Sequence, residues 1–122
     1  MNKIEDILVK AAHSNTAAVS YVEKNISDEI LFNEILVIVE SSIIGDSRLE
    51  GAYWITKFDK EIIIKYEDRL INLMNEELDS IVVHIMVALS KIKSKKALEI
   101  IIEKRIKPIL YWEGVALENY LC

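Results

Sequence analysis

Hydrophobic and polar residues follow the period of an α-helix along most of the chain. Ile4, Ile7, Leu8 and Ala11 have the spacing i, i+3, i+4, i+7, which predicts a short amphipathic helix over about 2–13. Comparable spacing predicts seven further helices, over about 16–24, 28–40, 48–58, 60–75, 80–91, 95–106 and 109–121. The helix over 80–91 is apolar on several faces, which is typical of a central position in a fold.

Polar residues at the ends of these patterns predict where helices begin and stop. Ser27 is expected to cap the helix that starts at 28, and Gly45 to end the pattern that follows it. The segment Ser47-Arg48-Leu49-Glu50 has the form of a capping box, which predicts a helix start there. Asp59 and Ser94 are expected to cap the helices that follow them.

Two short β-branched runs offer an alternative to an all-helical fold. Ile62 to Ile64 and Ile100 to Ile102 contain residues that favour strands. Each run lies inside a longer helical pattern without a hairpin turn signal, and the whole chain has only three Gly and one Pro. We therefore predict an all-α fold. A length of 122 residues corresponds to a single domain over 1–122.

One pattern in the chain consists of Asp79-Ser80, Ala88-Leu89-Ser90-Lys91-Ile92 and Lys96-Ala97-Leu98, with a more divergent copy from Ser47 to Phe58. This pattern resembles a HEAT-type repeat of the short form found in bacterial phycobilin-lyase-like proteins. The resemblance implies a right-handed stack of antiparallel helix pairs, an α-solenoid of about seven to eight helices that binds other macromolecules and has no common catalytic residues. The expected units are divergent N-terminal helices over 1–26 and helix pairs over about 28–58, 60–92 and 95–121.

Aligning the copies places one set of residues on the second helix of each pair. In a solenoid these helices line the inner surface, where a Trp flanked by charges suits a protein-binding hot spot. The alternative is that Trp54 and Trp112 belong to the core. The predicted partner-binding residues are Glu50, Trp54, Lys57, His84, Lys91, Glu113 and Tyr120.

The net charge of −5 is unevenly distributed. Residues 1–90 carry 8 basic and 16 acidic side chains, whereas residues 91–107 carry 7 basic and 2 acidic ones. The basic segment is either a solvated helix end with its preceding loop or a site for the phosphates of a nucleic acid. Residues 1–90 are acidic, and the sequence has no motif that reads bases. Nucleic acid is therefore the alternative partner, after a protein. Its predicted contacts are Lys91, Lys93, Lys95, Lys96, Lys104, Arg105 and Lys107.

Sequence motifs for catalysis, metals and cofactors are absent. His13 and His84 are the only histidines, and neither belongs to an HExxH or His-Cys cluster. The three glycines are isolated, so no glycine-rich phosphate loop exists, and the single Cys is the last residue. We expect no enzymatic activity, no metal and no cofactor.

These features together predict a non-catalytic protein-binding module. An acidic chain without chemistry suits a bacterial immunity protein, which would occupy the basic cleft of a toxin domain and associate with it rapidly. The alternatives are a nucleic-acid-binding HEAT-like protein and an oligomeric adaptor that pairs through its end helices. With no signal peptide or membrane span in the sequence, we expect a cytoplasmic monomer or homodimer.

Overall fold

The computed structural model describes residues 2–76, 79–104 and 118–120, which form helices and turns without any strand. The prediction of an all-α fold is therefore confirmed for this part of the chain, and Ile62 to Ile64 lie in a helix as expected. The labelled helices within the described residues are α1 (Lys3–Ala12), α2 (Thr16–Glu23), α3 (Glu29–Ser41), α4 (Gly45–Ile55), α5 (Lys60–Lys65), α6 (Glu67–Glu76), α7 (Asp79–Lys91) and α8 (Lys95–Lys104), and a helical turn follows at 118–120.

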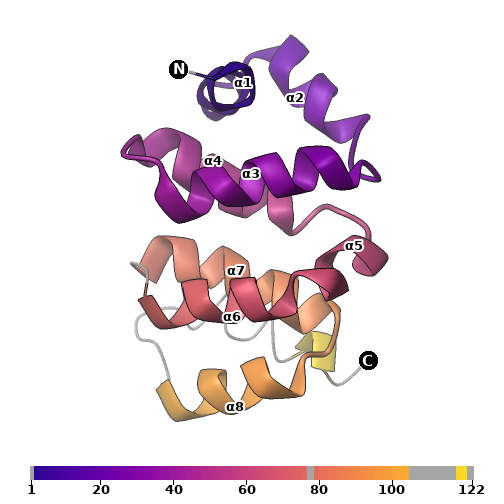
Figure 1. Cartoon of the computed structure of the whole chain (residues 1–122), viewed down its shortest axis with the longest axis vertical. Helices are drawn as coiled ribbons and strands as arrows, with labels where there is room; N and C mark the ends of the chain where they lie inside the picture. The colour runs from indigo at the N-terminus through magenta and orange to yellow at the C-terminus, as the bar shows by residue number, and fades with distance from the viewer. Residues whose placement is uncertain (1, 77–78, 105–117, 121–122) are drawn as a thin grey trace.

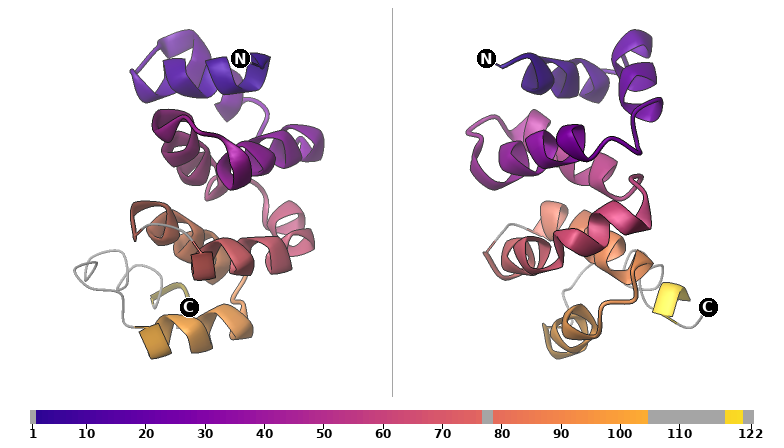
Figure 2. Two further views of the ribbon diagram at one scale, coloured as in Figure 1. Left: turned by 60° about the vertical axis from the view of Figure 1, so that its left-hand side comes forward. Right: turned by 45° about the vertical axis from the view of Figure 1, so that its right-hand side comes forward.

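The helices lie in successive layers along the longest axis of the molecule (Figure 1). Helices α1 and α2 form one end, α3 and α4 the next layer, α6 and α7 the layer after that, and α8 lies beyond them. Two further views show the same order of layers (Figure 2). In the view of Figure 1, α3 and α6 lie toward the viewer, with α4 and α7 behind them.

A single hydrophobic core runs through the layers, because each helix turns its apolar stripe toward its neighbours. Helix α4 packs against α1, α3 and α7, and α7 packs against α4, α5, α6 and α8, so these two helices join the layers. The approach of α4 to α3 requires Gly51, since a Cβ there would lie 2.8 Å from Cγ2 of Val39. The largest fully buried side chains are Leu8, Phe32, Ile35, Leu36, Ile55, Phe58, Ile63, Leu70, Met74, Ile85, Met86 and Leu89.

The turn between α1 and α2 and the turn between α7 and α8 have the same construction. Ser14 and Lys93 adopt positive φ angles of 64° and 54°, and the next residue donates its N–H to a carbonyl five residues back. This is the Schellman ending of a helix. The residue that closes each turn, Asn15 or Ser94, then caps the following helix through its side chain. Ser94 is thus confirmed as a helix cap.

The predicted ends of α3 and α4 were wrong in three respects. Asp28 rather than Ser27 caps α3, and Ser27 donates its hydroxyl to Asp59 instead. Gly45 begins α4 rather than ending α3. Ser47 is buried inside α4 and donates its hydroxyl to the carboxylate of Glu5 on α1, so it does not form the expected capping box.

The single helix predicted over 60–75 was also wrong, because it is broken at Tyr66. Asp59 stands at the N-cap position of α5, but its side chain makes no capping hydrogen bond there. Helix α5 ends at Lys65 and α6 begins at Glu67. Tyr66 lies against α3, with its ring centroid 5.0 Å from that of Phe32 and its hydroxyl 3.0 Å from Glu29 Oε2. Contacts with another helix therefore accompany the bend.

Among the described helices, none has both the length and the apolar character that a membrane span needs.

Candidate functional site

The side of the molecule formed by α4 and α7 presents an aromatic ring to solvent. Tyr53 is 37% exposed, and its ring makes edge-on contacts with the rings of Trp54 and His84, at centroid distances of 5.3 Å and 5.9 Å. Lys57 places its Nζ 5.3 Å from the centroid of the Tyr53 ring, a cation–π distance. We refer to Glu50, Tyr53, Trp54, Lys57 and His84 as the Tyr53 cluster.

Trp54 lies in the core, which confirms the alternative that the sequence left open and corrects its place among the partner-binding residues. Only 4% of its surface is exposed, because the α4 position that carries it faces the neighbouring helices. Its indole N–H donates to Glu50 Oε2 at 2.8 Å, which satisfies the polar edge of a buried ring. Burial raises the pKa of Glu50, and the bond from Trp54 offsets part of that rise.

His84 and Lys57 complete the polar part of the cluster. His84 is half-buried on α7, and its pKa is lowered, first by burial and second by the positive charge of Lys57. Lys57 follows the end of α4 and is exposed. The structure therefore brings together four of the predicted partner-binding residues: Glu50, Trp54, Lys57 and His84.

Lys91 has an internal role, which corrects its prediction as a binding residue for protein or nucleic acid. Its Nζ donates to the carbonyl oxygens of Thr56 and Phe58 at 3.0 and 2.8 Å. These carbonyls lie just after α4, where a cation favours the negative end of the helix dipole. Burial lowers the pKa of Lys91, with a further contribution from the charge of Lys57. The residue therefore fastens α7 to the end of α4.

Tyr120 also contacts the fold rather than standing free as a binding residue. Its hydroxyl donates to the carbonyl of Ser94 at 2.7 Å, in the turn between α7 and α8. Burial and the charge of Glu67 raise its pKa to about 12, so it stays protonated. Asn119 adds a bond from its side-chain amide to the hydroxyl of Ser90 at 2.9 Å. The helical turn 118–120 is thus fastened to α7 and to the turn that follows it.

Within the described part of the basic segment, Lys91 differs from the other lysines. Lys91 is directed toward α4, whereas Lys95 and Lys96 are exposed on the first turn of α8 and Lys93 is exposed in the turn before it. Lys96 lies 3.4 Å from Asp68 in an exposed ion pair. The remaining predicted positions lie outside the described residues or, for Lys104, outside the described side chains: Lys104, Arg105, Lys107, Glu113 and Trp112.

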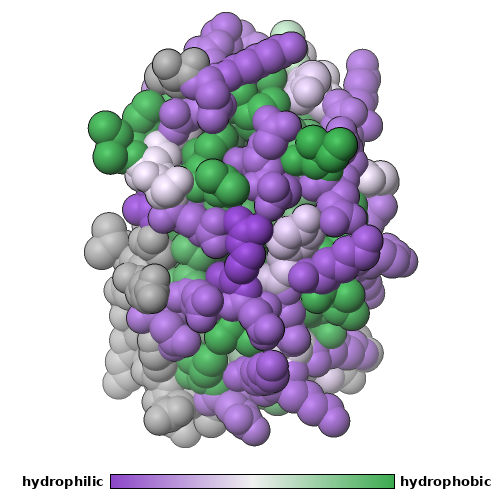
Figure 3. Space-filling view, in the orientation of Figure 1, coloured by the Kyte–Doolittle hydropathy of each residue, from purple (hydrophilic) through white to green (hydrophobic). Residues whose placement is uncertain are grey.

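The opposite side of the stack, formed by α3, α5 and α6, is held by polar contacts. Arg69 donates to both carboxylate oxygens of Glu40 and to Asn33, and Glu29 accepts from Lys65 and Tyr66. Hydrophobic residues on this face lie in separate patches among hydrophilic ones (Figure 3). This face is more typical of a solvated surface than of a binding patch.

Sequence reasoning found this part of the molecule but missed Tyr53. The exposed stripe of α4 contains Asp46, Leu49 and Tyr53 and continues to Lys57, at spacings of three and four residues. At Leu49 and Tyr53 it is offset by one residue from the predicted Glu50 and Trp54, whereas Lys57 belongs to both stripes. A signal was present, since Tyr53 and Lys57 have the i, i+4 spacing of a surface pair.

The described side chains offer no metal centre, because no three His, Cys, Asp or Glu among them are grouped closely enough to hold an ion. Comparisons of the chain with family models, curated proteins and solved structures give no match. The arguments for its function therefore rest on its own geometry.

Proposed function

We propose that this chain is a non-catalytic protein-binding module that holds its partner on the α4–α7 side, with Tyr53 as the anchor. The observation that carries the proposal is the fixed position of the Tyr53 ring, which contacts Trp54 and His84 on one side and solvent on the other. Tyrosine is enriched among residues that dominate binding energy, and a ring already held in place loses little conformational entropy on binding.

The surroundings of Tyr53 support a protein as the partner. Leu49, one turn earlier on α4, is 41% exposed and extends the apolar contact. Lys57 and His84 provide polar groups beside the ring, and this combination of an aromatic centre with a polar rim is typical of protein interfaces.

We propose further that the chain is a HEAT-like stack that acts as an immunity protein, neutralising a toxin domain in the cytoplasm. The successive layers of α3 packed on α4 and of α6 packed on α7 support a fold built from similar helix pairs (Figure 1). The net charge of −5 favours rapid association with a basic cleft such as that of a nuclease.

The test is a capture experiment with matched variants. Tagged wild-type protein is used to isolate a partner from nuclease-treated lysate of its source cells, and the affinity of the purified pair is then measured by calorimetry. Tyr53→Ala is expected to weaken binding by about 2 kcal/mol, roughly thirtyfold, as a hot-spot residue does. Ile64→Ala is the control, because Ile64 is an exposed apolar residue on α5, outside the Tyr53 cluster.

Each outcome bears on a different part of the proposal. Equal losses in Tyr53→Ala and Ile64→Ala would remove the α4–α7 side as the binding surface. A partner whose activity is harmful to cells and is blocked by this chain would support the immunity role. A harmless partner would contradict that role and leave a binding module. Recovery of nucleic acid alone, when nuclease is omitted, would contradict both.

A further inference from the structure

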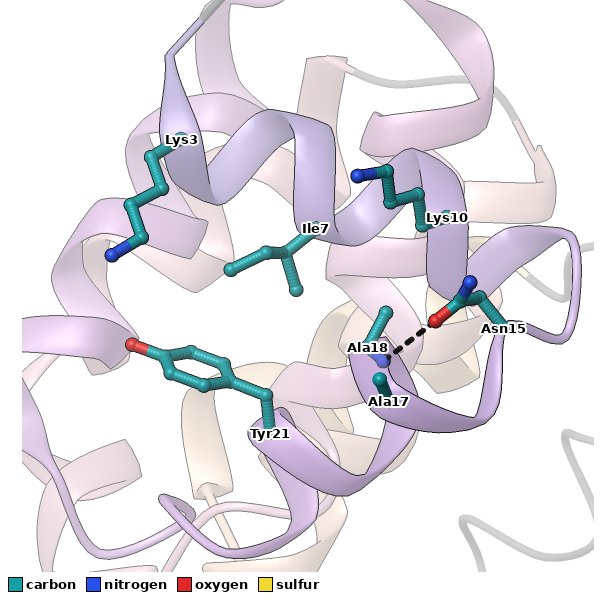
Figure 4. A pocket seen from close by; sticks show the side chains of 7 residues that line it. All are labelled: Lys3, Ile7, Lys10, Asn15, Ala17, Ala18 and Tyr21. Atoms are coloured by element: carbon teal, nitrogen blue, oxygen red, sulfur yellow. Dashed lines mark hydrogen bonds between the residues drawn. The ribbon is translucent and has the colours of Figure 1, made fainter.

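A groove separates α1 from α2 at the end of the stack (Figure 4). It has a volume of about 430 Å³, within the range of ligand sites. Helix α1 contributes one stripe of residues, and the turn and α2 contribute the opposite wall. The lining residues are Lys3, Ile7, Lys10, Asn15, Ala17, Ala18 and Tyr21.

The groove is polar at both ends and apolar in the middle. Figure 4 shows Lys3 and the hydroxyl of Tyr21 toward one end, Lys10 and Asn15 toward the other, and Ile7 between the two lysines. Ala17 and Ala18 have small side chains, which leave room between the two helices, and Ala18 is itself buried. A ligand would thus meet positive charge twice, with apolar contact between.

The charge of the groove is opposite to that of the chain. None of its seven lining residues is acidic, although the chain has a net charge of −5. Lys10 forms an ion pair with Asp6 on its own helix at 3.0 Å, and both side chains are more than half exposed. Such a pair contributes little, so a carboxylate of a ligand can compete for Lys10.

The spacing of the two lysines defines the shape of that ligand. Lys3 and Lys10 are seven residues apart on one helix, which separates them by about 10 Å along its axis. Two carboxylates seven residues apart on a second helix have the same separation, and the residues three and four positions after the first carboxylate then face Ile7 and Ala18. Small residues such as Ala17 permit the close approach that a helix in a groove requires.

We propose that this groove binds an acidic amphipathic helix of a partner protein, with two carboxylates seven residues apart and apolar residues between them. Lys3 and Lys10 bind the carboxylates, the Tyr21 hydroxyl and the Asn15 amide supply neutral donors beside them, and Ile7 and Ala18 contact the apolar residues. The site is separate from the Tyr53 cluster and does not depend on its function.

Fluorescence polarisation with two labelled peptides tests the proposal on the full chain. The probe is an acetylated and amidated 14-residue helical peptide, about 21 Å long, with glutamates at positions 4 and 11 and leucines at positions 7 and 8. The control peptide has the same composition, with its second glutamate at position 9, on another side of the helix. We expect the probe to bind about tenfold more tightly than the control peptide.

Variants of the chain separate shape from charge. Removing the two ammonium groups in the double variant Lys3→Gln, Lys10→Gln should weaken probe binding about tenfold. Lys24→Gln removes a charge at the end of α2, outside the groove, and should leave affinity unchanged. Ala17→Leu places a larger side chain in the groove at an exposed position and should weaken binding although both lysines remain. Circular dichroism confirms that each variant stays helical.

Three results would overturn the proposal. Equal affinity for the two peptides would mean that charge alone attracts the probe. A loss of affinity in Lys24→Gln as large as that in the double variant would mean the same. Displacement of the probe by decanedioate at a lower concentration than by unlabelled probe would make a small dicarboxylate the occupant instead of a helix. Tyr53→Ala should bind the probe normally, so a failure here is distinguishable from a failure of the α4–α7 surface.

Discussion

The layer of α3 and α4 is joined to the layer of α6 and α7 on two sides, and the two junctions differ in kind. On the α3–α6 side, the junction is a network of half-exposed charged groups, centred on Arg69 and Glu40. On the α4–α7 side, it consists of buried and half-buried groups, with Trp54 in the core and Lys91 bonded to carbonyls beyond α4.

The difference indicates how each side is used. On the α3–α6 side the prominent polar groups pair with one another across the helices, so few remain to direct a partner. On the α4–α7 side the buried groups carry the attachment, which leaves the ring of Tyr53 held in place and open to contact. A rigid exposed ring is more useful for binding than a charged group that already has a partner.

Trp54→Ala should give the largest effect and break the α4–α7 junction. Truncating a buried tryptophan removes its contacts and leaves a cavity, which costs about 3–5 kcal/mol of unfolding free energy. It also removes the N–H that Glu50 accepts. Urea denaturation measures the loss, and Tyr53→Ala, one residue away, is expected to lose only about 1 kcal/mol. Equal losses would mean that Tyr53 is a structural residue like Trp54.

That contrast marks the limit of what the sequence could predict. Local signals were sufficient for α7 and for the start of α8, where an apolar run and a capping serine agree. They did not identify which side of α4 faces the core, because this depends on Gly51 admitting α3 and on α7 packing against the same helix. As a result, Trp54 was left open between the core and the binding surface, and Tyr53 was missed.

Errors at the helix boundaries have the same origin. Ser47 reads locally as a cap, yet its hydroxyl bonds to Glu5, which is 42 residues away in sequence. Tyr66 reads as part of one long helix, yet it meets Phe32 and Glu29 of α3 at the break. In both cases a contact with a residue distant in sequence determines the local structure. The periodicity of hydrophobic residues along the chain does not report such contacts.

Arg69→Met should have a smaller effect, on the α3–α6 side. The variant keeps an unbranched apolar stem near Tyr66 but removes the bonds to Glu40 and Asn33. We expect a loss of about 1 kcal/mol at low salt, since the pair is bidentate but partly exposed. The loss should shrink at about 1 M salt, where the Debye length is about 3 Å.

Urea denaturation at both salt concentrations tests this, with Lys24→Met as the control for removing an exposed cation. The Trp54→Ala loss should barely depend on salt, because it arises from packing. A salt-independent loss in Arg69→Met would erase the distinction between a charged junction and a packed one.

The smallest expected effect is the pH dependence of stability that His84 and Glu50 cause on the α4–α7 side. Because the pKa of His84 is lowered from 6.5, the unfolded chain binds its proton more readily than the folded one. Stability should therefore fall as the pH drops through the window between 6.5 and the lower folded pKa, and the fall is absent above that window. Glu50 acts in the opposite sense, because its raised pKa makes stability fall as the pH rises through the window above 4.5.

Urea denaturation between about pH 8 and pH 4 separates these contributions, since histidine normally titrates in the upper part of this range and carboxyl groups in the lower part. Relative to His84→Gln, the wild type should lose stability as the solution is acidified below 6.5. Relative to Glu50→Gln, it should gain stability on acidification. His84→Gln also loses the ring contact with Tyr53, but this loss of stability does not depend on pH. It therefore cancels when the stability of each variant at one pH is compared with the stability of the same variant at another pH. Parallel pH profiles for wild type and His84→Gln would show that His84 is as well solvated in the folded chain as in the unfolded one. Water would then reach the surroundings of Tyr53, which contradicts a packed junction on the α4–α7 side.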